Sequence, residues 1–278
     1  MINFSILIAN YNNGKYFKEC YHSLINQTYE DWQVIIVDDA STDNSVEVIQ
    51  SLIGNDPRFK LYKNPVNKGC GFTKRECMKY AEGNLCAYLD PDDALYPEAL
   101  EKTFNEFVEQ DSLVAIYSQM MLCNENLIPE KVYASTKPIY NNRYFFNCPT
   151  QFAHFFVFKK EIYLRTSGIN PSLKSAVDQD LYLKILEQGE IKYIKEPLYF
   201  YRLHSNGISQ QSAKQSAKES FAKVIHETMK RRGIRKINNQ PVPETFTNAQ
   251  EIYELLNYQT NKMHRLISKI KVTLNNSI

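Results

Sequence analysis

The chain has 278 residues, of which 43% are hydrophobic and 23% are charged. This composition supports a hydrophobic core and excludes a disordered or collagen-like protein. The longest apolar runs fall far short of the ~20 residues of a membrane-spanning helix, and the first residues lack the pattern of a secretory signal. The six cysteines form no CxxC pair, which predicts reduced thiols and a cytoplasmic protein.

Charge is distributed unevenly along the chain. The formal net charge of +2 is too small to indicate a nucleic-acid partner. From residue 210 to the end, however, there are twelve Lys and Arg residues and only five Asp and Glu residues. An acidic body with a basic C-terminal part is consistent with contact between that part and an anionic surface.

Short β-rich runs alternate with helical patterns in the first half of the chain. Strands are expected at residues 4–9, 33–37, 59–62, 85–89 and 113–117. Helices are expected between them, and Ser41 or Thr42 can cap the second helix. This alternation predicts a doubly wound α/β domain with a mostly parallel sheet and helices on both faces.

The second half has a less regular pattern. Residues 124–149 are aromatic without a clear period, whereas a helix is expected at 178–188 and a strand at 191–201. The polar stretch 205–212 is the expected domain boundary, and helices are expected beyond it. The predicted divisions are a domain at 1–209, with a nucleotide-binding half (1–123) and an acceptor-side half (124–209), and a helical extension at 210–278.

Polar and acidic residues follow three of the predicted strands. The first strand ends in Asn-Tyr-Asn (10–12), the second in Asp-Asp (38–39) and the fourth in Asp-Pro-Asp-Asp (90–93). Ligands of open α/β sheets bind at the carboxyl ends of the strands. Crowded carboxylates need a cation, and oxygen donors select Mg²⁺ or Mn²⁺, which also bind phosphate oxygens. Because no glycine-rich phosphate loop is present, a metal-assisted nucleoside-diphosphate site is expected.

Four segments, in order and spacing, resemble the successive signatures of family 2 glycosyltransferases. They are Asn10-Tyr11-Asn12, residues 38–43, Asn67-Lys68-Gly69 and residues 89–93. The resemblance covers roughly residues 2–209. It implies the GT-A fold and an inverting transfer of a sugar from a nucleotide-sugar donor, usually linked to UDP. It also implies a carbohydrate or lipid-linked acceptor, in the synthesis of a surface polysaccharide or glycolipid.

The same resemblance implies roles for individual residues. The nucleotide would be bound by Ala9, Tyr11, Asp39, Lys74 and Asp90. Tyr11 would stack on the base and Asp39 would accept a hydrogen bond from it. Asp92 would bind Mn²⁺ or Mg²⁺, and His204, in a closing segment that runs to Ser209, would reach the metal or the diphosphate.

The catalytic base implied by the resemblance is Asp178, with Asp180 as the alternative. Val177 stands where the family often has Glu, which leaves both acids open. An Asp at a helix start is also often only a cap, and the helix N-terminus lowers its pKa. Two other departures are Ala40 in place of the usual Gly and Lys74 in place of Arg, which loses bidentate geometry.

Three other functions are weighed against glycosyl transfer. A sugar nucleotidyltransferase would carry a Gly-rich, Arg-containing loop after the first strand, and residues 10–15 contain none. A phosphatase would use Asp90 and Asp92 as nucleophile and acid. The third function is a catalytically silent nucleotide-sugar binding module. The acidic motif at Asp178 argues against it, and only a measurement of turnover would decide.

The C-terminal part is expected to end in one amphipathic helix from about residue 248. Its apolar stripe consists of Ile252, Leu255, Leu256, Met263, Leu266, Ile267 and Ile270. Lys262, Arg265 and Lys269 lie towards the other side. Such a stripe must be covered, either by the body or a second copy of the chain, or by an anionic membrane that holds a lipid-linked acceptor.

Overall fold

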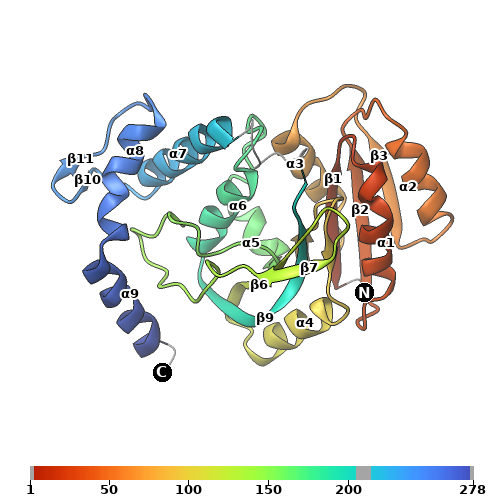
Figure 1. Ribbon diagram of the computed structural model, residues 1–278, viewed down its shortest axis with the longest axis horizontal. Coiled ribbons are helices and arrows are strands. Elements are labelled where there is room, and N and C mark those ends of the chain that lie inside the picture. Colours follow the sequence, from red (N-terminus) through yellow and green to blue (C-terminus); the bar gives the residue numbers. More distant parts are fainter. Residues whose placement is uncertain (1–2, 205–213, 276–278) are drawn as a thin grey trace.

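The computed structural model describes residues 3–204 and 214–275, which are arranged around a nine-stranded sheet (Figure 1). Its N-terminal half is parallel, in the order β3-β2-β1-β4. These strands are β1 (Phe4–Asn10), β2 (Trp32–Asp38), β3 (Phe59–Lys63) and β4 (Leu85–Tyr88). Parallel neighbours need crossover connections, which α1 (Phe17–Ile25), α2 (Ser45–Ile53) and α3 (Cys70–Tyr80) supply. The predicted α/β fold is confirmed.

Helices cover both faces of this sheet, because successive strand side chains point to opposite sides. Ile6 and Ile8 of β1 pack in one core cluster with α1, α2 and α4 (Ala99–Glu109). Leu7, between them, packs in the other cluster with α3, α5 (Lys160–Leu164) and α6 (Val177–Leu186). The two faces of β1 are therefore both buried, as a nearly continuous apolar run requires.

The second half of the sheet is mixed. β8 (Phe156–Lys159) pairs antiparallel with both β4 and β6 (Leu113–Cys123). The remaining strands are β5 (Ala94–Leu95), β7 (Pro129–Val132) and β9 (Glu190–Arg202). β9 is parallel to β6, whereas β5 and β7 form antiparallel pairs. The chain enters β8 from a long loop rather than a crossover helix, so the parallel pattern ends there.

The C-terminal part lies to one side of the sheet (Figure 1). It contains α7 (Lys214–Arg231), the hairpin β10 (Lys236–Ile237) and β11 (Gln240–Pro241), α8 (Ala249–Leu256) and α9 (Lys262–Asn275). A third core cluster joins α7 and α8 to Phe146 from the long loop. The expected boundary at 205–212 and the closing segment after His204 lie outside the described residues.

The expected single C-terminal helix is wrong. A short 3-10 turn (Asn257–Thr260) separates α8 from α9. The apolar stripe is divided there: Ile252 and Leu256 are buried, but Met263, Leu266, Ile267 and Ile270 are about half exposed or more. Within the described ranges, no helix is long and apolar enough to cross a bilayer.

Candidate active site

Short hydrogen bonds fix the chain where β1 and β2 end side by side. The Asn10 side chain donates to Asp38 at 2.8 Å. The Ser41 hydroxyl donates to Asp38 at 2.6 Å and accepts from the Asn12 backbone N–H at 2.9 Å. Ser41 therefore does not cap α2, which begins only at Ser45, and that prediction is wrong for both Ser41 and Thr42. These residues build the strand-end turn instead.

Asp39 holds the loop that leads into α3. Its buried carboxylate accepts from the Asn64 side chain at 2.8 Å and from the backbone N–H groups of Lys68 and Gly69 at 3.0 and 2.7 Å. Gly69 has φ of +88°, a conformation that favours glycine. Tyr11, just after β1, is 43% exposed, and its ring is available for stacking, while Ala9 is partly buried. Asp39 thus positions the loop that leads into α3.

Lys74 of α3 is buried between two carboxylates. Its Nζ lies 2.7 Å from Asp178 and 3.0 Å from Asp90. Burial opposes the charge on Lys74, yet these two carboxylates raise the pKa of its ammonium well above the ordinary value. The Tyr88 hydroxyl donates to the Lys74 carbonyl at 2.7 Å and ties this turn of α3 to β4. α3, β4 and α6 therefore meet at one cation.

Asp178 stands in the first turn of α6, with His154 beside it. One ligand atom each from Asp90, His154 and Asp178 lies within 4.8 Å of the others. Burial alone would raise the pKa of the Asp178 carboxyl, but the charges of Lys74 and His154 outweigh burial and lower that pKa. Sequence reasoning missed His154, which belongs to the irregular segment before β8 and carries no motif.

Asp92 contacts His204 rather than Lys74. The Asp92 carboxylate and His204 Nε2 lie 2.7 Å apart, and the His204 ring is buried against Tyr16, with ring centroids 4.7 Å apart. His204 Nδ1 is buried and has no hydrogen-bond partner among the described residues. Since Asp92 and His204 come from separate strand ends, the tertiary structure brings together two residues that the sequence placed 112 positions apart.

Asp93 is the last of the three acids Asp90, Asp92 and Asp93 (the acidic triplet), and its contacts are structural. Asp93 is buried and accepts from the Tyr199 hydroxyl and the Arg202 backbone N–H, both at 2.7 Å. Burial and the charges of Asp92 and Asp90 raise the pKa of the Asp93 carboxyl well above its ordinary value. The triplet thus divides: Asp90 faces Lys74, Asp92 faces His204, and Asp93 fastens β5 to β9.

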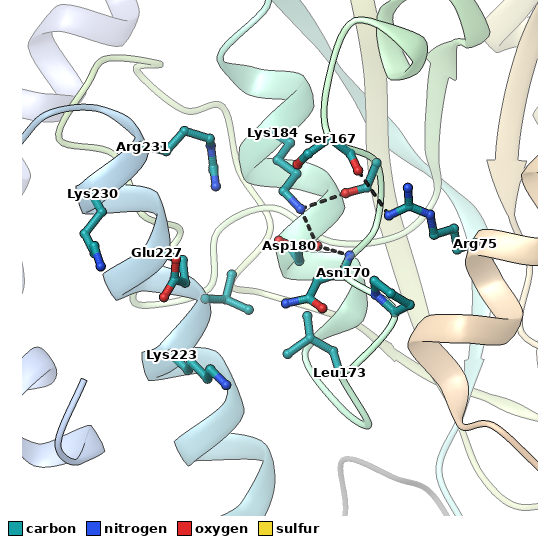
Figure 2. A pocket seen from close by; sticks show the side chains of 13 residues that line it. Arg75, Ser167, Asn170, Leu173, Asp180, Lys184, Lys223, Glu227, Lys230 and Arg231 are labelled. Carbon is teal, nitrogen blue, oxygen red and sulfur yellow. Dashed lines mark hydrogen bonds and ion pairs between the residues drawn. The ribbon is translucent and has the colours of Figure 1, made fainter. Parts of the chain in front are cut away.

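Asp180 lies in a different pocket from Asp178. Its carboxylate forms a buried ion pair with Lys184 at 2.8 Å and accepts from the Asn170 backbone N–H at 2.8 Å. Figure 2 shows this pocket, of about 470 Å³, between α6 and α7. Residues two apart on a helix do not face each other. The structure therefore brings Asp178, and not Asp180, to Lys74 and Asp90.

Comparison with known proteins matches this architecture. Residues 5–166 match the family model described as glycosyl transferase family 2. The chondroitin synthase of Escherichia coli is 34% identical over 241 residues, which cover 86% of this chain and 34% of that protein. The chain therefore spans about a third of the length of this relative.

Solved structures share the fold at lower identity. S. aureus TarS 1–349 in complex with UDP-GlcNAc has a TM-score of 0.66 at 20% identity, over 91% of this chain and 70% of that one. Mannosyltransferase PcManGT from Pyrobaculum calidifontis, in complex with GDP-Man and Mn²⁺, has a TM-score of 0.56 at 13% identity, over 99% of this chain and 86% of that one. At these identities the likeness concerns the fold. The family match covers the parallel half of the sheet and the acidic triplet, and the chain belongs to glycosyl transferase family 2.

Proposed function

We propose that the chain is an inverting glycosyltransferase that moves a sugar from a UDP-linked donor to an acceptor hydroxyl in polysaccharide synthesis. The observation that carries this proposal is the cluster of Lys74, Asp90 and Asp178, with Asp92 and His204, beside the strand ends of a family 2 chain. UDP is favoured because a neighbour of the same fold holds UDP-GlcNAc. Polysaccharide synthesis is favoured because a relative is named a chondroitin synthase.

The donor nucleotide is assigned to the edge formed by β1, β2 and α3. The half-exposed Tyr11 ring offers a stacking surface for the base, next to Ala9. Asp39 already accepts three hydrogen bonds, so contact with the base would add a fourth at a carboxylate with room for about four. Lys74 supplies a buried positive charge and Asp90 a ribose contact.

In the proposed reaction, Asp178 accepts the proton of the acceptor hydroxyl. The acceptor oxygen forms a bond to the anomeric carbon as the bond from that carbon to the diphosphate oxygen breaks, with inversion. The lowered pKa keeps Asp178 ionised and ready to accept the proton. Lys74 keeps this carboxylate oriented at 2.7 Å.

Asp92 and His204 form a better site for a divalent cation than Asp90 and Asp178 do. Asp90 and Asp178 already share the ammonium of Lys74, which would repel a second cation. His204 instead places Nε2 2.7 Å from the Asp92 carboxylate, and its buried Nδ1 has no hydrogen-bond partner among the described residues. The carboxylate oxygens of Asp92 suit Mn²⁺ or Mg²⁺. When bound, such an ion would offset charge that develops on the leaving diphosphate.

Two alternatives remain less well supported. A sugar nucleotidyltransferase would need a Gly-rich loop after β1, where the chain instead forms a short 3-10 turn (Gly14–Tyr16). A silent nucleotide-sugar binding module would keep the donor site without turnover. Asp178 and His154 beside Lys74 favour an enzyme over that module.

The proposal is tested with the purified full chain, Mn²⁺ and a panel of nucleotides. UDP at 100 times its dissociation constant should stabilise the fold by ~2.7 kcal/mol, and more than GDP or ADP. Asp92→Ala should remove the metal dependence of UDP binding, and chelation should abolish sugar transfer, read by the inverted anomeric configuration of the product. Equal stabilisation by all three nucleotides, or full transfer in excess EDTA, contradicts the proposal.

The C-terminal helices carry the remaining proposals about location. Two arrangements would cover the exposed side chains Met263 and Ile270 of α9. In the first, the protein is cytoplasmic and α9 lies on the inner face of the membrane. In the second, α9 packs against a second copy of the chain in a homodimer. Flotation with anionic vesicles and sedimentation of the full chain distinguish them. A monomer that does not float excludes both arrangements.

A further inference from the structure

A large groove separates the long loop from the C-terminal helices. It has a volume of about 1480 Å³ and lies between residues 137–151, the β10–β11 hairpin and α9. Lys271 of α9 lies 5.3 Å from the Tyr140 ring centroid, and the Gln259 side chain donates to the Tyr144 carbonyl at 3.0 Å, so both walls are held together. Small-molecule sites are typically about 300–1,000 Å³. This groove suits a longer ligand.

Positive charge dominates the walls of this groove. Six cations line it: Lys137, Arg143, Lys236, Lys262, Arg265 and Lys271. Among the described lining residues, none is Asp or Glu. Lys137 and Arg265 both line the groove, and burial together with the charge of Arg265 lowers the pKa of Lys137. An anionic ligand would relieve this repulsion.

The uncharged lining residues suit a sugar polymer. Tyr140, Tyr144 and Tyr258 supply aromatic rings with hydroxyl groups, and Asn142 and Gln151 supply amides that both donate and accept hydrogen bonds. A sugar ring presents apolar C–H faces and hydroxyl edges, which these two kinds of side chain match. Lysines with apolar residues alone would fit a lipid surface equally well, but the amides and tyrosines favour a carbohydrate.

The groove is connected to the candidate active site through one segment of the chain. Gln151 lines the groove, and three residues later His154 lies within 4.8 Å of Asp178. Three extended residues span at most about 11 Å. In the same segment the Asn147 side chain donates to Gln179, the neighbour of Asp178, at 2.7 Å. The segment that lines the groove therefore also contacts the surroundings of Asp178, the proposed base.

We infer that this groove binds the growing acceptor as an anionic polysaccharide chain, behind the end that receives the sugar. The inference rests on the proposed glycosyl transfer and names the substrate class of the same site. It assigns to α9 and the long loop a role in holding the polymer between successive additions.

The test measures binding without the donor, so that it is independent of turnover. Long oligosaccharides of hyaluronan and poly(ribitol phosphate) serve as anionic probes, dextran as the neutral probe, and phosphatidylserine vesicles as the lipid probe. The full chain should bind at least one anionic polymer, weakly at high salt, and should not bind dextran. The double variant K262E/R265E should weaken this binding at least tenfold.

A matched variant controls for net charge. K131E/K195E changes two exposed lysines that do not line the groove and should leave polymer binding unchanged. The inference is overturned if neither polymer binds, if both double variants weaken binding equally, or if only the vesicles bind. UDP binding and sugar transfer are measured separately: polymer binding without transfer would refute the proposed function alone, and transfer without polymer binding would refute this inference alone.

Discussion

At the residue scale, Asp178 and Asp180 lie two positions apart on α6 but have different partners. Asp178 contacts Lys74 at the strand ends, whereas Asp180 pairs with Lys184 in a separate pocket. Asp178→Asn is nearly isosteric but cannot accept a proton. It should therefore lower turnover by ~10²–10⁴ while UDP binding is retained. Steady-state kinetics and thermal shift with UDP measure the two effects.

Asp180→Asn is the matched control for this prediction. It leaves the buried Lys184 ammonium without its carboxylate, which should cost about 3–5 kcal/mol of stability. The turnover of the folded fraction should change little. A severe loss of turnover in Asp180→Asn, with a mild effect of Asp178→Asn, would move the base to Asp180.

A second residue-scale prediction concerns Ala40, whose φ is +57°. A left-handed conformation costs an alanine roughly 1–2 kcal/mol but costs glycine almost nothing. Ala40→Gly should therefore raise the free energy of unfolding by about 1 kcal/mol, measured by urea denaturation. Ala134→Gly, in a loop where φ is not positive, should instead lower it by about 0.4–1 kcal/mol. Loss of stability in both variants contradicts strain at Ala40.

At the element scale, α3 sits against the loop before α6, and this contact sets the distance between Lys74 and Asp178. The Gly71 backbone N–H donates to the Leu173 carbonyl at 2.9 Å. A Cβ on Gly71 would meet that carbonyl oxygen at 2.5 Å and the Asn170 carbonyl oxygen at 2.6 Å. The helix position is thus open only to glycine, because both obstructing atoms belong to the backbone.

Gly71→Ala therefore gives a prediction opposite to helix propensity. Alanine normally stabilises a helix by about 1 kcal/mol relative to glycine. Here the clash should lower stability by roughly 1–3 kcal/mol, read as a fall in the midpoint of thermal unfolding. Turnover should also fall, because α3 moves Lys74 away from Asp178. An unchanged or raised midpoint would show that α3 adjusts freely.

The expected and observed sheets agree for strands that can be recognised from their own residues. β1 and β2 are apolar on both faces, so they are recognisable as buried parallel strands from their residues alone. β8 has a similar composition, Phe-Val-Phe-Lys, but its direction depends on a loop with no period. Its antiparallel pairing therefore follows from the path of the chain and not from its residues.

At the scale of the whole molecule, the C-terminal part is joined to the body through a shared core. Phe146 of the long loop packs with Ile252 and Leu256 of α8, and all three are buried. Deleting residues after Gln240 removes both α8 side chains from this core, a loss of about 4 kcal/mol of burial energy. The midpoint of thermal unfolding should fall markedly, and the exposed Phe146 should promote aggregation.

Deleting residues after Asn261 is the control, because it removes only α9. Met263, Leu266, Ile267 and Ile270 are about half exposed or more, so their loss should change the midpoint little. Equal destabilisation by both truncations would mean that α9 belongs to the core. A large fall in the midpoint for the first truncation and a small one for the second would confirm that the apolar stripe is divided. Its α8 part would then belong to the core and its α9 part to the exposed surface.

The sequence by itself determined the alternation of strands and helices, the apolar faces and the strand-end acids, because each depends on neighbouring residues. It could indicate Asp90, Asp92 and Asp178 as site residues but not their partners. Only the tertiary structure decided that Lys74 joins Asp90 to Asp178, that Asp92 faces His204 and that Asp93 is structural. The physical reason is that contacts between residues 16 to 112 positions apart depend on how whole elements pack, which no local pattern records.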